Sequence, residues 1–333
     1  MKLYHVDKGR KSFYVQKIGE NAMTDMIKIT NLVKRYGDVI ALDHLDLEVR
    51  ECEIFGLLGP NGSGKTTAIN CILALLRYDR GEISVLGKPM TPTSYDSKAK
   101  IGVVFQNVAV FEQMSVYENI DYFCSLYITD RAARSKCVQE AVEFTGLGDY
   151  QKKRPKQLSG GLLRRLNIAC GIAHKPKLIF MDEPTVAVDP QSRNHILEGI
   201  QEMNRNGSTV VYTSHYMEEV EQICTRVAIL DHGRCIASGT SEELKGMIRT
   251  GETVTVESIV LTPEQLESIR NLEQVFSAEY SEETLKLKYG SSGNLIALLH
   301  LLESEKISFG RVFSEKPTLN DVFLELTGTE LRD

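Results

Sequence analysis

Residues 54–67 read Ile-Phe-Gly-Leu-Leu-Gly-Pro-Asn-Gly-Ser-Gly-Lys-Thr-Thr. The apolar run at 54–58 has the length of a buried strand, and it leads directly into Gly-x-x-x-x-Gly-Lys-Thr at 59–66. Apolar residues then recur with a helical period, so we expect a helix over 67–77. A strand, a glycine-rich loop and a helix in this order predict a phosphate-binding loop.

The residue types of this loop suit the phosphates of a nucleotide. Its glycines allow backbone N–H groups to turn toward a phosphate, and Lys65 is long enough to reach the β- and γ-oxygens. The Thr66 hydroxyl is a ligand type that Mg²⁺ accepts. The following helix directs its positive end at the same phosphates. We therefore predict a nucleotide site made by Gly59, Pro60, Asn61, Gly62, Ser63, Gly64, Lys65, Thr66 and Thr67.

Composition places limits on the other functions. The chain has 333 residues and a net charge of -6, which argues against nucleic acid as a partner. Its seven cysteines include no Cys-x-x-Cys pair, which argues against a disulfide framework and a zinc site. No apolar run approaches the ~18 residues of a membrane span, and no secretion signal is evident, so we expect a cytoplasmic protein.

Charge and pattern predict three regions. Residues 1–25 have little periodicity and are either a loosely held extension or a segment before the functional start. Residues 251–333 carry 15 acidic and 7 basic residues, which supports a boundary near residue 250. Their pattern reads β-α-β-β-α-β-α and suggests a ferredoxin-like module. That module is either regulatory or dimer-stabilising, or its acidic surface is merely solvated.

Between these regions, polar residues follow three further apolar runs. Gln106 follows the run at 101–105, Asp182 and Glu183 follow the run at 178–181, and His215 closes the one at 210–212. Parallel sheets bind ligands at the carboxyl ends of their strands. Asp182 can hold Mg²⁺, and Glu183 is placed to orient or deprotonate a water molecule. His215 is either structural or a donor to a γ-phosphate.

Other segments indicate smaller elements. Alternating apolar residues at 27–29 and 45–49 predict half-buried antiparallel strands. A capping box of Ser115 and Glu118 begins a helical insert over about 107–175. Within it, Leu-Ser-Gly-Gly at 158–161 precedes a helix over 162–173, which makes either a second anion site or simply a good helix cap. Tyr36 is either a base-stacking residue or an ordinary surface tyrosine.

This ordered set resembles the motifs of an ATP-binding-cassette (ABC) ATPase over about residues 26–245. In family terms they are Walker A, the Q-loop, the signature, Walker B with its catalytic glutamate, the D-loop at Asp189 and the H-loop. The run Ser-His-Tyr-Met-Glu-Glu-Val-Glu at 214–221 looks like ATP-binding subunits of ABC-2-type exporters, including the drug and antibiotic efflux branch. The sequence departs from the pattern at Leu162, often Gln, and at Ala187, often Gly.

The resemblance implies an α/β fold: a P-loop ATPase core over 26–250, with an antiparallel β subdomain and a helical subdomain, and then the C-terminal α+β module. It implies that ATP and Mg²⁺ bind, with Thr66, Gln106 and Asp182 at the metal. It also implies that Glu183 is the base, that Gln106 senses the metal and the attacking water, and that His215 steadies the γ-phosphate. The resemblance adds nucleotide contacts from Tyr36, Ser159, Gly160, Gly161 and Asp189.

The resemblance also implies partners. In the family, the signature of one subunit closes over ATP on the Walker A loop of another, so we expect a homodimer or a heterodimer. The pair would power a separate ABC-2-type permease from the inner face of the membrane, and residues 111–117 are a candidate contact surface. The alternative is a cytosolic nucleotide-controlled clamp or assembly ATPase that transports nothing.

Overall fold

The computed structural model describes residues 6–7, 10–11, 25–290 and 295–328. It divides into two compact units between Thr240 and Ser241, so the expected boundary near residue 250 lies too late in the chain. The reason is contact with the end of the second unit: residues 241–245 pack against residues 319–327, and the Arg249 amide and the Thr250 hydroxyl both donate to Glu325. Most of the expected extension over 1–25 lies outside the described residues. The described part of this extension contains two short strands, β1 (Val6–Asp7) and β2 (Arg10–Lys11), which pair antiparallel.

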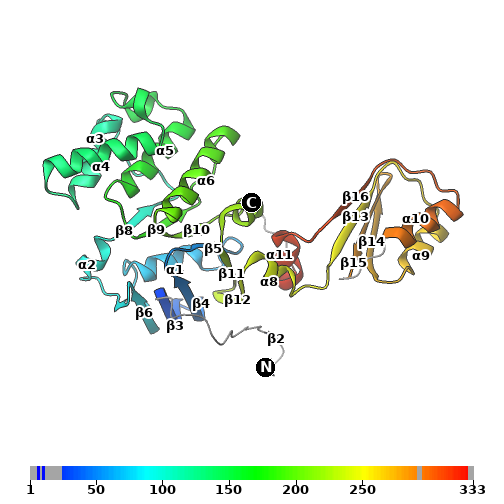
Figure 1. Ribbon diagram of the computed structural model, residues 1–333. Coiled ribbons are helices and arrows are strands. Elements are labelled where there is room, and N and C mark those ends of the chain that lie inside the picture. Colours follow the sequence, from blue (N-terminus) through cyan, green and yellow to red (C-terminus); the bar gives the residue numbers. More distant parts are fainter. Residues whose placement is uncertain (1–5, 8–9, 12–24, 291–294, 329–333) are drawn as a thin grey trace. The chain divides into compact units, whose positions relative to one another are not determined.

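A six-stranded sheet forms the centre of the first unit, with β5 (Ile54–Leu58) as an inner strand (Figure 1). All five residues of β5 are buried, as the apolar run predicted. Five strands run parallel, and only β12 pairs antiparallel with its neighbour β11. From one edge of the sheet to the other, the strands are β12 (Arg234–Gly239), β11 (Arg226–Asp231), β5, β10 (Thr209–Thr213), β9 (Leu178–Asp182) and β8 (Ile101–Val104).

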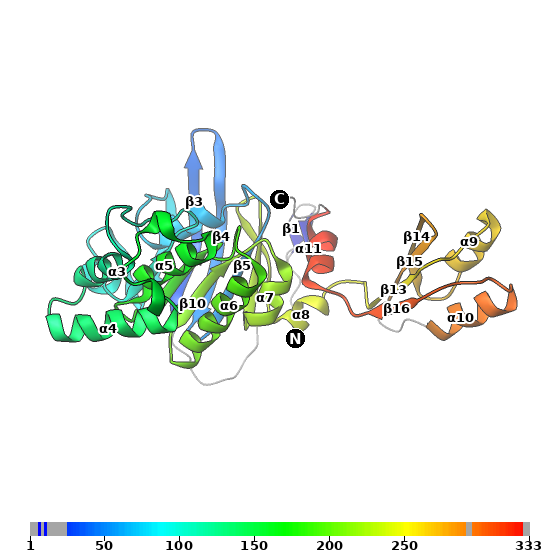
Figure 2. The same ribbon diagram turned by 90° about the horizontal axis from the view of Figure 1, so that it is seen from above.

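An antiparallel sheet packs beside the first. Its strand order is β4 (Val39–Arg50), β3 (Asp25–Tyr36), β6 (Arg80–Val85) and β7 (Lys88–Pro89). The apolar residues at 27, 29, 45, 47 and 49 are buried, which confirms the predicted half-buried strands, and β3 with β4 projects as a long hairpin (Figure 2). Buried residues of β4, α1 (Lys65–Ile72) and β5 share one core, so the helix after the phosphate loop lies between the two sheets.

Helix α1 differs from its predicted range of 67–77. It begins earlier, at Lys65, and ends at Ile72. The chain leaves the helical conformation because Ala74 adopts a left-handed backbone with φ 52°, which cannot continue a right-handed helix. A short helix, α2 (Tyr95–Lys98), precedes β8.

The expected helical insert is present and has its own hydrophobic core. Figure 1 shows α3 (Val116–Ser125), α4 (Arg131–Phe144) and α5 (Gly160–Ile172) grouped together, away from β3, β4 and β6. Ser115 and Glu118 form the predicted capping box at the start of α3. Two 3₁₀ turns lie between α4 and α5 (Gly148–Tyr150 and Pro155–Gln157), and α6 (Pro190–Arg205) and α7 (Met217–Ile223) follow later in the unit.

The second unit has the predicted order of elements. It begins with α8 (Ser241–Lys245), which ends earlier than the expected position near residue 250. Its last strand, β16 (Val312–Glu315), likewise lies later than the expected range of 307–313. Four antiparallel strands in the order β14-β15-β13-β16, with two helices between them in the chain, give the β-α-β-β-α-β arrangement of the ferredoxin-like motif. The elements after α8 are β13 (Glu252–Val256), α9 (Pro263–Arg270), β14 (Val275–Ser281), β15 (Thr284–Tyr289), α10 (Leu295–Ser304), β16 (Val312–Glu315) and α11 (Leu319–Thr327).

The turn between β11 and β12 supports the phosphate loop. The Gly233 amide donates to the Ser63 carbonyl at 3.0 Å, and the Gly233 carbonyl accepts from the Asp43 amide at 2.9 Å. Gly233 has φ 75°, and a Cβ placed there would lie 2.6 Å from the Ala41 carbonyl oxygen. The turn, the loop and the start of β4 therefore meet at a point that has no room for a side chain.

We expect Gly233→Ala to lower the free energy of unfolding by about 2 to 4 kcal/mol, because it adds an overlap to the backbone strain of about 1 to 2 kcal/mol. Gly87→Ala is the matched control, since Gly87 has φ 72° in another hairpin turn and nothing within 4 Å of its added Cβ. Urea unfolding of both variants measures the difference. Equal losses of stability would show that the contact at Ala41 is unimportant.

Candidate nucleotide site

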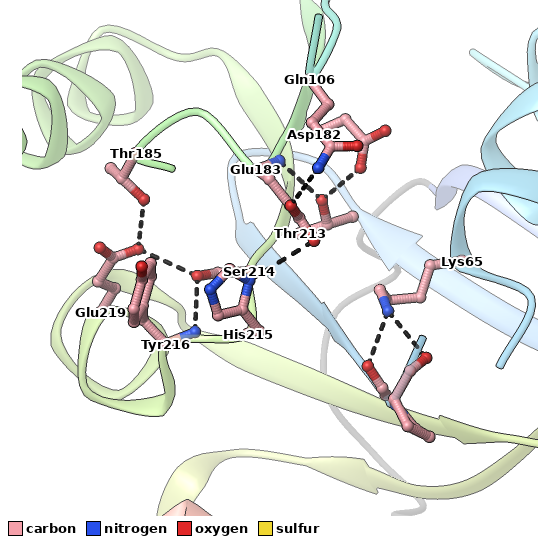
Figure 3. Close-up of polar contacts among 12 residues, drawn as sticks. Lys65, Gln106, Asp182, Glu183, Thr185, Thr213, Ser214, His215, Tyr216 and Glu219 are labelled. Carbon is pink, nitrogen blue, oxygen red and sulfur yellow. Dashed lines mark hydrogen bonds and ion pairs between the residues drawn. The ribbon is translucent and has the colours of Figure 1, made fainter. Parts of the chain in front are cut away.

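The phosphate loop folds around the ammonium group of Lys65. Lys65 Nζ donates to the carbonyl oxygens of Gly59 at 2.7 Å and Pro60 at 3.1 Å (Figure 3). Gly59, Gly62 and Gly64 all have positive φ, which turns the backbone in the way the glycine pattern predicted. Burial lowers the pKa of Lys65, and the nearby carboxylates of Glu183 and Asp182 act in the opposite direction.

The polar residues at the strand ends come together, as the parallel sheet predicted. Glu183 accepts a hydrogen bond from Gln106 Nε2 at 2.7 Å, and its other carboxylate oxygen lies 3.6 Å from His215 Nδ1 (Figure 3). Asp182 accepts from the Thr213 hydroxyl at 2.6 Å. Gln106 and His215 therefore flank Glu183 on its two oxygens.

These residues and the phosphate loop share one cavity of about 520 Å³. It contains a cation from the loop, two carboxylates and a histidine, which is the chemistry needed to bind an anionic substrate and to move a proton beside it. Its lining consists of Ala41, Asn61, Gly62, Gly64, Lys65, Thr66, Thr67, Gln106, Asp182, Glu183, Val186, His215 and Tyr216.

Other predicted site residues lie outside this lining. Ser159 caps α5 by accepting from the Leu162 amide at 3.3 Å, and among the described residues neither it nor Gly160 or Gly161 lines the cavity. Asp189 caps α6 by accepting from the Ser192 amide at 2.9 Å. The chain's own cavity thus brings together the residues of the Walker A, Q-loop, Walker B and H-loop segments without the Leu-Ser-Gly-Gly segment.

Two further predicted residues, and one position that departs from the family pattern, have distinct surroundings. Tyr36 is half exposed, and the Lys34 ammonium lies 5.0 Å above its ring. Ser63, inside the phosphate loop, has a buried hydroxyl with no hydrogen-bond partner among the described residues. Ala187 adopts a left-handed backbone with φ 58°, a conformation that favours glycine, so this departure from the family pattern holds the loop before Asp189 under strain.

Arg164 is a residue that sequence reasoning missed. It lies within α5, is only 4% exposed and donates to five backbone carbonyls. Its partners lie at the end of β9 or directly after β8 and β9, so one side chain ties the Gln106 and Glu183 segments to the helix that Ser159 begins. Those carbonyls belong to Phe105 (3.1 Å), Gln106 (2.6 Å), Asp182 (3.5 Å), Glu183 and Pro184 (2.8 Å).

A magnesium ion fits the donors that are present. Thr66, Gln106 and Asp182 line the same cavity, and they offer hydroxyl, amide and carboxylate oxygens, the ligand types that Mg²⁺ prefers. Because Thr213 already donates to one Asp182 oxygen, the other oxygen is available to the metal or to one of its waters. Mg²⁺ commonly uses few protein ligands and completes its shell with water and phosphate oxygens.

A glycine-rich loop folds around a lysine, and adjacent Asp and Glu residues lie beside it at the edge of a parallel sheet. This combination defines a P-loop nucleoside triphosphatase. The family described as "ABC transporter" matches residues 42–186. The linearmycin resistance ATP-binding protein LnrL of Bacillus subtilis is 36% identical over 92% of this chain and 100% of its own length. The chain therefore belongs to the ABC transporter family of ATP-binding proteins and is an ATPase of that family.

One more relative and one solved structure are also similar to this chain. The Nod factor export ATP-binding protein I of Cupriavidus metallidurans is 34% identical over 93% of this chain and 100% of its own length. A dimeric structure of the ATP-binding cassette MJ0796, bound to ADP and Pi after hydrolysis, has a TM-score of 0.59 and 27% identity. The similarity covers 65% of this chain and 98% of the MJ0796 chain, and it confirms the predicted cassette fold.

We expect Arg164→Lys to lower kcat about tenfold and the melting temperature by about 5 °C. A lysine lacks the planar set of five N–H donors, so it leaves buried carbonyls of both strands without partners. ATPase assays and thermal unfolding measure the two effects. Arg165→Lys is the control on the same helix, because among the described residues the Arg165 side chain donates a single hydrogen bond, to the Thr145 carbonyl at 3.4 Å. An Arg164→Lys variant with normal kcat would contradict this role.

Proposed function

We propose that two such chains, or one chain and a close relative, assemble head to tail and hydrolyse two ATP molecules to power export through a separate membrane permease. The observation that carries this proposal is the division of the predicted site residues. One cavity holds the phosphate loop, the carboxylates and His215, while Ser159, Gly160 and Gly161 lie outside its lining. Each chain then supplies one half of each nucleotide site.

On the phosphate side, Lys65 and the loop amides neutralise the triphosphate, and the amino end of α1 adds its partial positive charge. The bonds from Lys65 to Gly59 and Pro60 hold the ammonium inside the loop before the phosphates arrive. Thr66 and Asp182 hold Mg²⁺, which neutralises charge on the phosphate oxygens when it is bound. Tyr36, half exposed, provides a ring on which the base stacks.

On the water side, Glu183 acts as the general base. Gln106 orients the attacking water, and it already lies within hydrogen-bonding distance of Glu183. His215 lies on the other side of Glu183 and donates to the γ-phosphate. The 3.6 Å distance between His215 Nδ1 and a Glu183 carboxylate oxygen supports a shared role for these two residues.

The second chain completes the site. Its Ser159 hydroxyl and the amides at Gly160 and Gly161 bind the γ-phosphate, and its Asp189 lies at the interface. These contacts require an intact triphosphate, so ATP favours the closed pair and hydrolysis favours its opening. The cycle of closing and opening does mechanical work on the permease.

An ABC-2-type permease is the proposed membrane partner. No helix in the described part of the chain is both long and apolar enough to cross a bilayer. The relatives named above are a resistance protein and an export protein, which supports a cytoplasmic subunit attached to an exporter at the inner face of the membrane. The choice of exported compound then belongs to the permease.

The surface proposed for this contact is an aromatic cluster of Phe111, Tyr122 and Phe123. Phe111 and Tyr122 are each 40% exposed, and their ring centroids lie 4.9 Å apart. Buried Asn119 accepts from the Phe111 amide at 2.7 Å and donates to its carbonyl at 3.0 Å, so the segment is held in place. Tyr117 and Phe123 both pack against the core of the helical subdomain, so Phe111 and Tyr122 supply the exposed rings. Of these two residues, Phe111 lies within the expected surface of residues 111–117.

We expect Glu183→Gln to bind ATP and to form a stable, ATP-loaded dimer while hydrolysis falls at least about a hundredfold, the usual effect of losing a general base. Light scattering and retained nucleotide measure the dimer, and phosphate release measures turnover. Lys65→Ala is the contrasting variant, because it weakens ATP binding and stays monomeric. Near-normal hydrolysis by Glu183→Gln, or full activity in a preparation that stays monomeric during turnover, would refute the proposal.

We expect the double variant Phe111→Ala and Tyr122→Ala to reduce the permease's effect on ATPase activity at least fivefold and to leave the activity of the isolated subunit within about twofold. The physical reason is that both rings lie outside the nucleotide cavity and are available to a partner. The assay compares the subunit alone and in proteoliposomes with the permease. Tyr95→Ala is the control, since Tyr95 is a 72% exposed aromatic residue of α2. Unchanged stimulation by the permease would place the contact elsewhere.

A further inference from the structure

Glu219 of α7 is a buried carboxylate beside the cavity that the proposed mechanism does not use. It is 4% exposed, and one of its oxygens accepts from the hydroxyls of Thr185 at 2.7 Å, Tyr212 at 2.6 Å and Ser214 at 3.1 Å. Its other oxygen lies 3.3 Å from Arg193 Nε. Figure 3 shows Thr185 and Ser214 converging on this carboxylate. A buried carboxylate is costly without such partners, so three hydrogen bonds and the positive charge of Arg193 stabilise it.

The three hydroxyl groups and Arg193 come from three segments around the site. Thr185 follows the catalytic pair in the chain, Tyr212 belongs to β10, and Ser214 immediately precedes His215. Arg193 lies in the first turns of α6, the helix that Asp189 caps. Burial and the neighbouring Glu219 raise the pKa of Tyr212 well above its usual value, so its hydroxyl remains a donor. Glu219 is therefore the point where these segments meet.

Two routes lead from Glu219 to the ring of His215. In the first, the Ser214 hydroxyl that donates to Glu219 also accepts from the Tyr216 amide at 3.0 Å, which holds the turn that contains His215. In the second, the Arg193 guanidinium lies 4.6 Å above the ring of Tyr216. That ring packs against the imidazole of His215 at 4.1 Å between centroids.

We propose that Glu219 is a positioning residue that sets the separation of His215 and Glu183 through Ser214 and Arg193, and so makes this separation depend on the helix capped by Asp189. This inference rests on the proposed roles of His215 and Glu183. Because Asp189 is proposed to lie at the interface, a partner chain that moves the start of α6 also moves Arg193. Full activity of His215 then requires the paired state.

The test is a kinetic double-mutant cycle on the full-length protein. Arg193→Met removes the ion pair with Glu219 and the cation above Tyr216, and we expect kcat to fall about tenfold with the KM for ATP changed less than about twofold. Arg193→Lys keeps a positive charge and should retain most of the activity. In a His215→Ala background, Arg193→Met should lower kcat less than about twofold, because the residue through which it acts is absent.

The matched control is Arg134→Met. Arg134 also forms a part-buried ion pair, with Asp121 at 2.8 Å, but it lies in the helical subdomain, and we expect its kcat to stay unchanged. A second readout is the side-chain NMR signal of His215, identified by its loss in His215→Ala. That signal should shift in Arg193→Met and in Glu219→Gln and stay in place in Arg134→Met.

Two results would overturn the inference: the same fold loss from Arg193→Met with and without His215, or a His215 signal that does not move. These two results can be distinguished from a failure of the proposed ATPase function. If the unaltered protein failed to hydrolyse ATP, or if Glu183→Gln kept full activity, the ATPase roles themselves would be wrong. If those roles hold and the Arg193 and His215 effects simply multiply, only the positioning role of Glu219 is refuted.

Discussion

The site depends on the common direction of β5, β8, β9 and β10, which brings the carboxyl ends of these strands to a single edge of the sheet. Residues just past this edge no longer belong to a strand, so their backbone carbonyls have no neighbouring strand from which to accept hydrogen bonds. Buried carbonyls need other donors. Arg164 supplies donors to five of them. The positions of Gln106 and Glu183 are therefore set by a side chain from α5 as well as by their own strands.

Much of this site could be predicted from the sequence because its residues follow strong local patterns. The phosphate loop has a fixed spacing, and its strand and helix follow from apolar periodicity. Once the strands are taken as parallel, Gln106, Asp182, Glu183 and His215 must gather at one edge. The C-terminal elements were predicted in the right order for the same reason, since alternation and capping boxes, as at Thr262, are local signals.

What could not be predicted depends on contacts between distant residues. Arg164 lies among apolar residues of a helix, and nothing in its neighbours shows that carbonyls 18 to 59 residues away accept its hydrogen bonds. Glu219 looked like one of several acidic residues on a helix, and its burial follows from partners on three other segments. The unit boundary was misplaced because Glu325 binds residues 249 and 250 from far along the chain. Charge asymmetry could not report that contact.

In the proposed dimer, helix α5 serves both nucleotide sites. Its amino end, capped by Ser159, binds the phosphate held by the partner chain, and Arg164, little more than one turn later, holds Gln106 and Glu183 of its own chain. A helix is stiff over so short a distance, so the amino end cannot move far without moving the guanidinium. Binding of ATP in one site then changes the positions of the catalytic residues in the other. This linkage gives a physical reason for the two sites of such a pair to work together.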